Sequence, residues 1–361
     1  MIHGLYPPDL AEDWDNVGLQ AGDPGSTVTR VLVSLDPTEE AVAQALRRNC
    51  QALLTHHPLI LRPLKNITPS DETGRTTLTA IRNNISLIAA HTNLDSAPQG
   101  LNDWLAARLG VQDTAVLEET SAELVKLVVF VPRDHAESVA EAIFSAGAGH
   151  IGKYSHCSFR VAGTGSFLPG DEAQPYLGRR GELEQVDEVR FETILPRRLS
   201  GKVLDKMLRA HPYEEVAYDL YPLHNRLQGS GLGRYGTLSA DTTLHEFALQ
   251  VKEALGISTL RLVGDPQRTV RKVAVCGGSA ASLLGVADRH GVDALVTGDI
   301  KYHEARQAEQ RGIAVLDAGH FGTEHIVIAG LASALEAEAQ RRGLELEFLH
   351  MDTEADPFIT V

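Results

Sequence analysis

The sequence contains the same pattern twice, an apolar strand, a helix and a second apolar strand, at places far apart in the chain. The first copy is Val31–His57 and the second is Val273–Asp299, and an offset of 242 residues aligns them without a gap. At the end of this alignment His56-His57 fall on Gly298-Asp299. Internal similarity of this length predicts two related α/β lobes, an internal duplication, that form one core. The alternative is that any two strand–helix–strand units look alike.

In the first lobe, residue types that bind metals follow two neighbouring strands. His56 and His57 end the second strand, and His91 and Asp95 follow a third strand predicted at residues 85–90. If the crossovers are parallel and right-handed, these strand ends meet at one edge of the sheet, where open α/β sheets bind ligands. Imidazoles and a carboxylate at that edge predict a metal site.

The second lobe ends its strands in a similar way. His320 and Glu324 follow a strand predicted at residues 313–316 and lie four residues apart, so both can point at one ion from a helix start. Asp299 and His303 are also four residues apart, and they share one face if that segment is helical. An alternative for Asp299 is that it only caps the following helix.

Together these residues predict a centre that holds two divalent metal ions with a shared carboxylate. Mixed imidazole and carboxylate ligands suit Zn, Mn, Fe or Ni, and the pattern does not select one of them. The predicted ligands are His56, His57, Asp95, His320 and Glu324, with His91 in a second, supporting layer. A two-metal centre lowers the pKa of bound water and makes hydroxide available near neutral pH. Asp299 and His303 are candidates for proton transfer.

Between the two lobes the pattern changes, from about residue 124. We predict strands at 126–132, 158–163, 186–195 and 216–221, and helices at 136–146 and 200–210. This order, β-α-β…β-α-β, is that of a ferredoxin-like sandwich. The predicted domains are therefore lobe 1 at residues 1–123, an inserted α+β domain at 124–225 and lobe 2 at 226–361. Gly229–Gly233 is predicted as a hinge-like junction, because no helix follows at once to complete a phosphate-binding loop.

Composition narrows the function classes. The 361 residues carry a formal net charge of −15, which opposes nucleic-acid binding because phosphate contacts need a basic surface. Cys50, Cys157 and Cys276 are far apart, which favours buried free thiols over disulfides or a thiolate zinc site. The chain does not open with a signal-peptide pattern, and it has no apolar stretch long enough to cross a bilayer. We therefore predict a cytoplasmic location.

Two polar segments are predicted near the site. Residues 11–20 combine acids, an amide and Trp14, which fits either a wall of the site or an N-terminal arm anchored by a buried Trp. Residues 65–75 are predicted as a loop, followed by a helix at 77–84.

Cys276 and Ser279 follow a strand without the residue order of a nucleophile elbow, so neither is predicted to be a nucleophile.

Six segments together resemble the GTP cyclohydrolase 1 type 2 homologues, also called NIF-three-like proteins. The segments are A-E-D-W-D-N-V-G-L-Q (11–20), L-L-T-H-H-P (53–58), A-A-H-T-N-L-D (89–95), V-C-G-G-S (275–279), T-G-D-I-K-Y-H-E-A (297–305) and D-A-G-H-F-G-T-E (317–324). The resemblance covers nearly the whole chain. It implies a dinuclear metal centre on the five predicted ligands, with Glu324 as the bridge, and a toroidal homohexamer whose sites face an internal cavity.

The insert resembles the one in longer bacterial members of this family, which is similar to PII-like signalling trimers. The matching segments are G-A-G-H-I-G-K-Y-S-H-C-S-F (147–159) and H-P-Y-E-E-V-A-Y-D-L-Y-P (211–222). Two functions fit these features. The first is a metal-dependent hydrolase that uses metal-activated water on a small, nucleotide-like substrate. The second is a non-catalytic metal-binding regulator or metallochaperone whose insert senses a ligand or partner.

Overall fold

The chain folds into two units. Unit 1 comprises Met1–Thr120 and Gln228–Val361, and unit 2 comprises Ser121–Leu227. The structure, a computed structural model, describes residues 1–121, 124–152 and 154–359. The predicted insert at residues 124–225 falls inside unit 2. The predicted end of lobe 1, at residue 123, lies outside the described residues.

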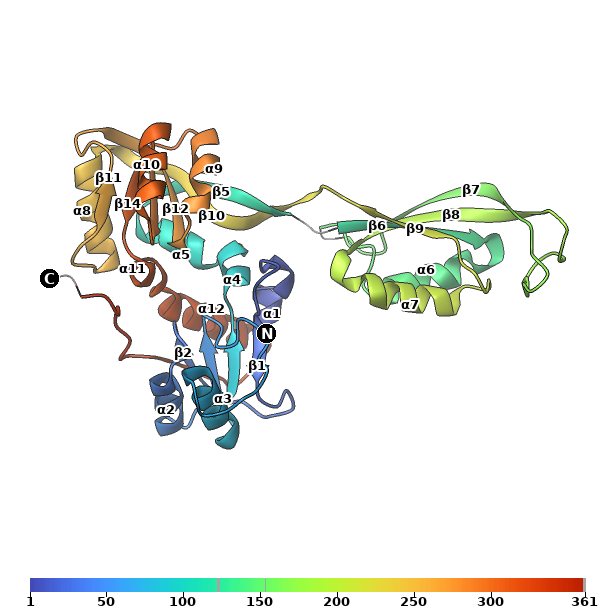
Figure 1. The fold of residues 1–361 in the computed structure, drawn as a ribbon, viewed down its shortest axis with the longest axis horizontal. Helices are drawn as coiled ribbons and strands as arrows, with labels where there is room; N and C mark the ends of the chain where they lie inside the picture. Colours follow the sequence, from blue (N-terminus) through green and yellow to red (C-terminus); the bar gives the residue numbers. More distant parts are fainter. Residues whose placement is uncertain (122–123, 153, 360–361) are drawn as a thin grey trace. The chain divides into compact units, whose positions relative to one another are not determined.

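Unit 1 contains two sheets, and Figure 1 labels β1 and β2 of the first. This sheet has the strand order β1-β4-β3-β2-β15. Its strands are β1 (Gly18–Ala21), β2 (Arg30–Ser34), β3 (Ala52–Thr55), β4 (Ser86–Ala89) and β15 (Glu347–His350). β15, β2, β3 and β4 run parallel to their neighbours, whereas β1 is antiparallel to β4. The parallel pairing predicted for the strands that precede His56 and His91 is therefore confirmed.

The second sheet of unit 1 has the strand order β11-β14-β13-β12-β10-β5. Its strands are β5 (Gln112–Ser121), β10 (Arg226–Thr243), β11 (Arg261–Val263), β12 (Thr269–Ser279), β13 (Ala294–Gly298) and β14 (Ala314–Asp317). β12, β13 and β14 are parallel, and β10 and β11 pair with them in the antiparallel sense.

The segment Gly229–Gly233 belongs to β10, so the prediction that it forms a hinge is wrong. The glycines have another use there. A Cβ on Gly231 would lie 2.0 Å from the carbonyl oxygen of Glu118, so a side chain at this position would clash with β5. Glycine inside a strand often marks such a close approach of a second backbone.

Ten α-helices belong to the described part of unit 1. They are α1 (Ile2–Leu5), α2 (Glu39–Arg47), α3 (Glu72–Arg82), α4 (Thr92–Ser96), α5 (Leu101–Arg108), α8 (Leu244–Leu255), α9 (Leu284–Arg289), α10 (Tyr302–Arg311), α11 (His320–Glu324) and α12 (Val327–Arg342). α3 begins inside the segment predicted as a loop at 65–75, because the Asp71 side chain accepts a hydrogen bond from the amide of Gly74 and caps the helix.

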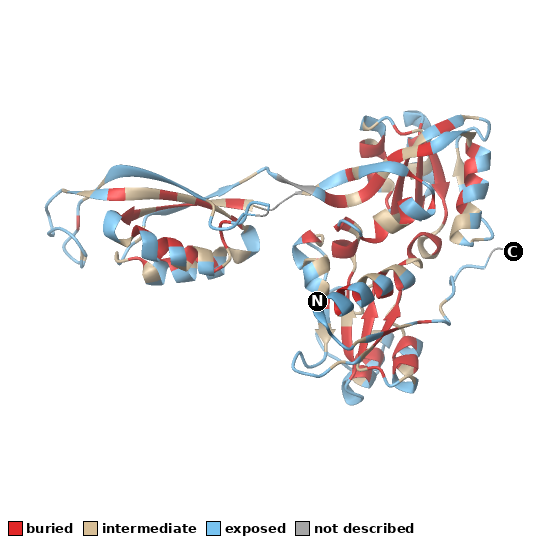
Figure 2. Ribbon diagram, turned by 180° about the vertical axis from the view of Figure 1, so that it is seen from behind, coloured by how far each residue is buried: buried red, intermediate tan, exposed pale blue. Residues whose placement is uncertain are grey.

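The strands of both sheets are buried, as Figure 2 shows in red. In β12, Val273 and Val275 pack with Phe247 of α8 and other residues of one core cluster. Ala274 and Cys276 alternate with them and pack into a second cluster on the opposite face. Burial on both faces is typical of parallel strands covered by helices. The strand ends are therefore where polar side chains of unit 1 can gather.

Unit 2 is a four-stranded sheet, order β7-β8-β6-β9, with antiparallel neighbours. Its elements are β6 (Leu124–Pro132), α6 (Ala136–Ser145), β7 (Ser158–Phe167), β8 (Glu184–Pro196), α7 (Ser200–Ala210) and β9 (Tyr218–Pro222). Both helices pack with β6 and β8 around a core that contains Val129, Phe191 and Met207. None of the described helices of either unit is both long and apolar enough to span a membrane.

The three cysteines are free thiols. Cys50 and Cys276 are buried, as predicted, and Cys157 is half-buried. Lys153, which belongs to the matching segment 147–159, lies outside the described residues.

Candidate metal centre

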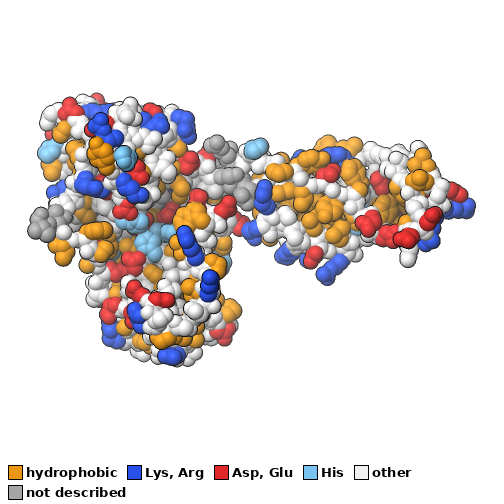
Figure 3. All heavy atoms as spheres, viewed as in Figure 1, with side chains coloured by type: hydrophobic (Ala, Val, Ile, Leu, Met, Phe, Trp, Pro, Cys, Tyr) orange, Lys and Arg blue, Asp and Glu red, His pale blue; other side chains and the backbone are white. Residues whose placement is uncertain are grey.

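Three histidines meet at the carboxyl edge of the first sheet. His56 and His57 follow β3, and His91 follows β4 next to it. The ring centroids lie 5.2 Å apart for His56 and His57, 5.2 Å for His56 and His91, and 5.6 Å for His57 and His91. One ligand atom from each ring lies within 4.8 Å of the others, a spacing that suits a metal ion. Figure 3 shows a group of histidine side chains with acidic side chains beside it on unit 1.

The second sheet adds a histidine and a carboxylate from α11, directly after β14. The Nε2 atom of His320 lies 3.0 Å from Oε2 of Glu324, and Nε2 of His57 lies 2.9 Å from the same oxygen. His57, His320 and Glu324 form a second group whose ligand atoms lie within 4.8 Å of one another. His57 belongs to both groups, so the two groups are adjacent.

Each of the four imidazoles is held by its Nδ1 atom. The acceptors are the carbonyl oxygen of Ala90 for His56 (2.8 Å), Asp36 for His57 (2.7 Å), Asp15 for His91 (2.9 Å) and Asp299 for His320 (2.7 Å). An acceptor at Nδ1 places a proton there and leaves Nε2 as the ligand atom. This outer hydrogen bond is the usual companion of a metal-binding histidine.

Two buried atoms test whether the cluster fits a cation. Nε2 of His56 and Oδ1 of Asp95 have no hydrogen-bond partner among the described residues, and they lie 3.6 Å apart. Nε2 of His56 also lies 3.8 Å from Oε1 of the buried Glu324. Buried polar atoms without partners are costly, and a positive ion bound between them would remove that cost. The donor set therefore fits a divalent metal.

The pKa shifts in the cluster also indicate surroundings that favour a positive charge. Burial alone would lower the pKa of His57, but hydrogen bonds to two carboxylates raise it to about 10. The hydrogen bond to Glu324 raises the pKa of His320 to about 9 against the effect of burial. Burial raises the pKa of Asp95 to about 7, whereas the imidazoles around Glu324 hold its pKa well below the usual range despite burial. Without a metal, protons fill the place that a cation would take.

Gly278, at the end of β12, leaves space for the carboxylate of Glu324. A Cβ at that position would lie 2.2 Å from Oε1 of Glu324 and 3.2 Å from Nε2 of His320. Its φ of +61° is also one that residues with a side chain rarely adopt. Gly278, the second glycine of the V-C-G-G-S segment, is thus a site residue that the sequence reasoning missed.

The residues predicted for proton transfer lie in different surroundings. Asp299 precedes α10 with a φ of +58° and accepts the hydrogen bond from His320. It does not share a helix face with His303, and the cap position of α10 is Lys301, so the shared-face and helix-cap interpretations are both wrong. His303 is exposed in the first turn of α10, with its ring against Tyr302. Its role in proton transfer stays a prediction.

Other outcomes concern the surroundings of the cluster. The ligand atom of His91 groups with those of His56 and His57, so His91 is placed as a direct ligand candidate as well as a supporting residue. The Trp14 side chain is 58% exposed and lies edge-on to His91 at 5.8 Å between centroids, which favours the wall interpretation over a buried anchor. Asp15 and Asp36 were not singled out from the sequence.

Known proteins match this chain over nearly its whole length. The family described as Duf34/NIF3 (NGG1p interacting factor 3) matches residues 1–357. The chain belongs to the DUF34/NIF3 family. A relative from Halalkalibacterium halodurans named GTP cyclohydrolase 1 type 2 homolog is 42% identical over 353 residues, which cover 98% of this chain and 95% of the relative. A Bacillus subtilis relative of the same name is 41% identical over 359 residues, 99% of this chain and 96% of its own.

Solved structures of DUF34/NIF3 proteins share the fold. The crystal structure of a Bacillus cereus protein related to NIF3 superposes with a TM-score of 0.73 at 43% identity, covering 100% of this chain and 97% of that one. The Staphylococcus aureus protein SA1388 superposes with a TM-score of 0.78 at 28% identity, covering 100% and 96%. The family predicted from the sequence segments is therefore confirmed.

Proposed function

We propose that this DUF34/NIF3 protein binds two divalent metal ions per subunit through His56, His57, Asp95, His320 and Glu324, and that the centre hydrolyses a small, nucleotide-like substrate. The observation that carries the proposal is the convergence of four Nδ1-anchored imidazoles on two carboxylates, with the buried atoms of His56 and Asp95 facing each other unpaired. Two overlapping groups of ligand atoms, one with His56 and His91 and one with His320 and Glu324, support a count of two ions, with the free ring nitrogen of His57 going to one of them. The metals that suit this donor set are Zn, Fe, Mn and Ni.

The residues of the chain have separate tasks in this proposal. Bound divalent ions would supply Lewis acidity and lower the pKa of bound water. Glu324 would be the shared carboxylate, which is supported by its Oε2 beside His57 and His320 and its Oε1 facing His56. Asp36 and Asp299 hold the rings of His57 and His320. Trp14 forms an exposed wall beside His91, where it can exclude water from one side of a substrate.

Basic side chains near the cluster support an anionic substrate. Lys301 and Arg261, which also pairs with Asp317, line a groove with a cavity volume of about 520 Å³, and Asp299, which holds His320, lies in the same groove. Cationic side chains next to a metal centre attract phosphate groups. The names of the two curated relatives point to a purine nucleotide in the same way.

The test has a binding part and an activity part. Protein purified without a metal-affinity tag is analysed for bound metals, stripped and titrated with Zn²⁺, Mn²⁺, Fe²⁺ and Ni²⁺. We expect two ions per subunit in the wild type, loss of binding in His57→Ala and Glu324→Ala, and unchanged binding in His245→Ala, which removes an exposed histidine of α8. The loaded proteins are then screened for turnover of GTP, other nucleotides and phosphoesters.

The outcomes separate the two functions. Turnover that depends on the ligand residues supports the hydrolase. Two bound ions with no turnover of any compound in the panel would exclude the hydrolase in favour of a metal-binding regulator or metallochaperone. Failure to bind any of the four metals would overturn the proposal as a whole.

Two architectural predictions are part of the same proposal. We infer that the lobes of unit 1 arose by duplication, because Val31 pairs with Ala52 in one sheet and their counterparts Val273 and Ala294 pair in the other. We also propose a ferredoxin-like insert, supported by the order β7-β8-β6-β9. The toroidal homohexamer stays a prediction, which light scattering on the purified protein tests.

A further inference from the structure

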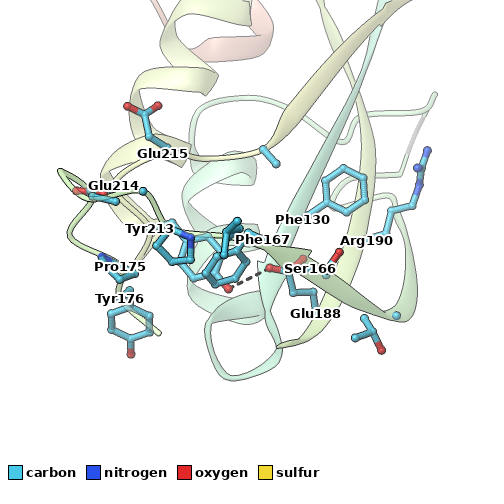
Figure 4. A pocket seen from close by; sticks show the side chains of 18 of the residues that line it. Phe130, Ser166, Phe167, Pro175, Tyr176, Glu188, Arg190, Tyr213, Glu214 and Glu215 are labelled. Atoms are coloured by element: carbon cyan, nitrogen blue, oxygen red, sulfur yellow. Dashed lines mark hydrogen bonds between the residues drawn. The ribbon is translucent and has the colours of Figure 1, made fainter. Parts of the chain in front are cut away.

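Unit 2 contains a cavity that the proposed metal chemistry does not use. Its volume is about 680 Å³, within the usual range of pockets for small molecules. The end of β7, the loop that follows it and the turn after α7 enclose it (Figure 4). The lining is mainly apolar, with the aromatic rings of Phe130, Phe167, Tyr176 and Tyr213 around it.

One buried acidic side chain lies at this cavity. Glu188 of β8 is only 9% exposed, and its Oε1 accepts a hydrogen bond from the Tyr213 hydroxyl at 3.0 Å. No other hydrogen bond to its carboxylate is found among the described residues. The carboxylate lies over Gly165 of β7, where a Cβ would come within 2.1 Å of Oε2. Glycine at 165 therefore gives Glu188 the space to turn toward the cavity.

The charges around the cavity favour a cation. Glu188, Glu214 and Glu215 line it, against one guanidinium, that of Arg190. Arg190 is already engaged, because its Nε donates to Glu192 at 2.7 Å. A buried carboxylate that has one neutral donor for company is costly, and a positive group beside it would lower that cost.

The aromatic rings define the rest of the ligand. The rings of Phe167 and Tyr213 lie 5.9 Å apart between centroids, and those of Tyr176 and Tyr213 lie 6.3 Å apart. The faces of such rings attract cations and pack against flat apolar groups. The Tyr176 side chain is 53% exposed, so a bound molecule could cover it. The turn that carries Tyr213 is tied to the loop, since Glu214 accepts from the amide of Gln174 at 2.7 Å.

We propose that unit 2 binds a small organic cation, an ammonium or guanidinium group on an apolar or aromatic body, with the cationic group at Glu188 and the body between Phe167, Tyr176 and Tyr213. The site would make the H-P-Y-E-E segment, which supplies Tyr213, Glu214 and Glu215, part of a binding function. This inference does not depend on the metal centre of unit 1.

The experiment is calorimetry on the full chain in EDTA, so that no metal in unit 1 can bind the probe. The probes are phenethylamine, its neutral analogue phenethyl alcohol and the anion 3-phenylpropionate. We expect phenethylamine to bind and the other two to bind at least about tenfold more weakly, since a charge-assisted hydrogen bond is the main polar contact. Glu188→Gln keeps the shape and should weaken phenethylamine binding by about tenfold or more.

Controls locate the site and guard against misfolding. Glu182→Gln removes an exposed acid of unit 2 that does not line the cavity, and His245→Ala changes an exposed residue of unit 1, so both should bind as the wild type does. If Glu188→Gln does not fold by circular dichroism, Tyr176→Ala takes its place, because it removes a half-exposed ring from the cavity, and it should weaken binding several-fold. No binding of phenethylamine at millimolar concentration, equal binding of the alcohol or the anion, or unchanged binding in the folded Glu188 or Tyr176 variant would each overturn the proposal.

Discussion

The two sheets of unit 1 share a scaffold but supply different ligands. In each sheet three consecutive parallel strands, β2-β3-β4 and β12-β13-β14, lie in the same spatial order with an antiparallel strand beside the third. The first sheet adds β15 parallel to β2, whereas the second has β10 antiparallel to β12. The first sheet ends in the imidazoles of His56, His57 and His91. At the positions of His56 and His57 the second sheet has Gly298 and Asp299, and its contributions come from α11. The difference shows that the scaffold provides a meeting edge, while the residues at the strand ends decide what that edge binds.

The difference also has a steric side. A Cβ on Gly298 would lie 2.7 Å from the backbone of Gly319 and His320, so an imidazole could not replace this glycine without moving α11. The second sheet therefore has no metal ligand at the end of β13, and the glycine there allows His320 and Glu324 of α11 to come close. If this view is right, substitutions in the two sheets should have unequal effects on metal binding.

The largest effect is expected from losing the carboxylate that faces both sheets. Glu324→Ala removes an oxygen within 3.0 Å of two imidazoles, whereas His56→Ala removes one imidazole of three on its side. We expect Glu324→Ala to lower metal affinity by more than the roughly 10–100-fold typical for loss of an outer partner. This loss of affinity should also be larger than the loss caused by His56→Ala. Calorimetric titration with Zn²⁺ measures both. Equal losses would mean that the two sheets contribute alike.

Gly278→Ala should come next, because it acts on the same carboxylate by steric contact. The new Cβ would lie 2.2 Å from Oε1 of Glu324, so the carboxylate must move. The matched control is Gly291→Ala, with a φ of +64° and no atom within 4 Å of its Cβ. Both variants should lose about 1 kcal/mol of unfolding free energy for the left-handed backbone, measured by urea denaturation. Only Gly278→Ala should lose metal affinity, and a loss in Gly291→Ala would point to a general backbone effect.

The outer carboxylates give a smaller, graded comparison between the sheets. Asp36→Ala frees the ring of His57, which belongs to both groups of ligand atoms, and Asp299→Ala frees His320, which belongs to one. We expect losses of metal affinity within about 10–100-fold for both, with the larger loss for Asp36→Ala. Asp288→Ala, which removes an exposed carboxylate of α9 that pairs with Arg311 and is not among the metal-ligand groups, should have no effect. A larger loss for Asp299→Ala would reverse the order of importance of the two rings.

Much of this site could be predicted from strand ends, because β pairing places consecutive parallel strands side by side. His56, His57 and His91 follow from that rule. Asp36 could not be found in this way. Its position before Pro37-Thr38 marks it as part of a helix start, but Thr38 caps α2, which leaves the Asp36 side chain free to hold His57. Which acid caps a helix and which turns to a neighbour depends on the path of the chain in three dimensions.

Distant pairings in the fold were missed for the same reason. β5 and β10 pair in one sheet although more than a hundred residues of unit 2 separate them along the chain, and the glycines of β10 look like a hinge until Glu118 is placed against Gly231. For Asp299 and His303 the sequence predicted a close relation that the structure does not have. Their spacing of four suits a helix, but the chain enters α10 only at Tyr302. Spacing rules hold only where the predicted element forms.

The last comparison concerns the pH dependence of stability in the metal-free protein, where metal affinity plays no part. The pKa of His57 is raised to about 10, that of His320 to about 9 and that of Asp95 to about 7. A group whose pKa is higher in the folded state adds stability that is present below its unfolded pKa and is lost as pH rises through the folded one. Urea denaturation in EDTA should therefore show the unfolding free energy falling between pH 3.8 and about 7 from Asp95, and between pH 6.5 and about 10 from His57 and His320.

This fall depends on protons held against Glu324 by imidazoles of both sheets. Glu324→Gln removes the charge that raises the pKa of His57 and His320, so its stability should fall less over the same pH range. Saturating Zn²⁺ should act in the same direction, because the ion replaces the protons on Nε2. If the wild type, the Glu324→Gln variant and the metal-loaded protein lose stability in parallel, the histidines of the two sheets do not share a proton network, and the cluster would have to be explained as separate hydrogen-bonded pairs.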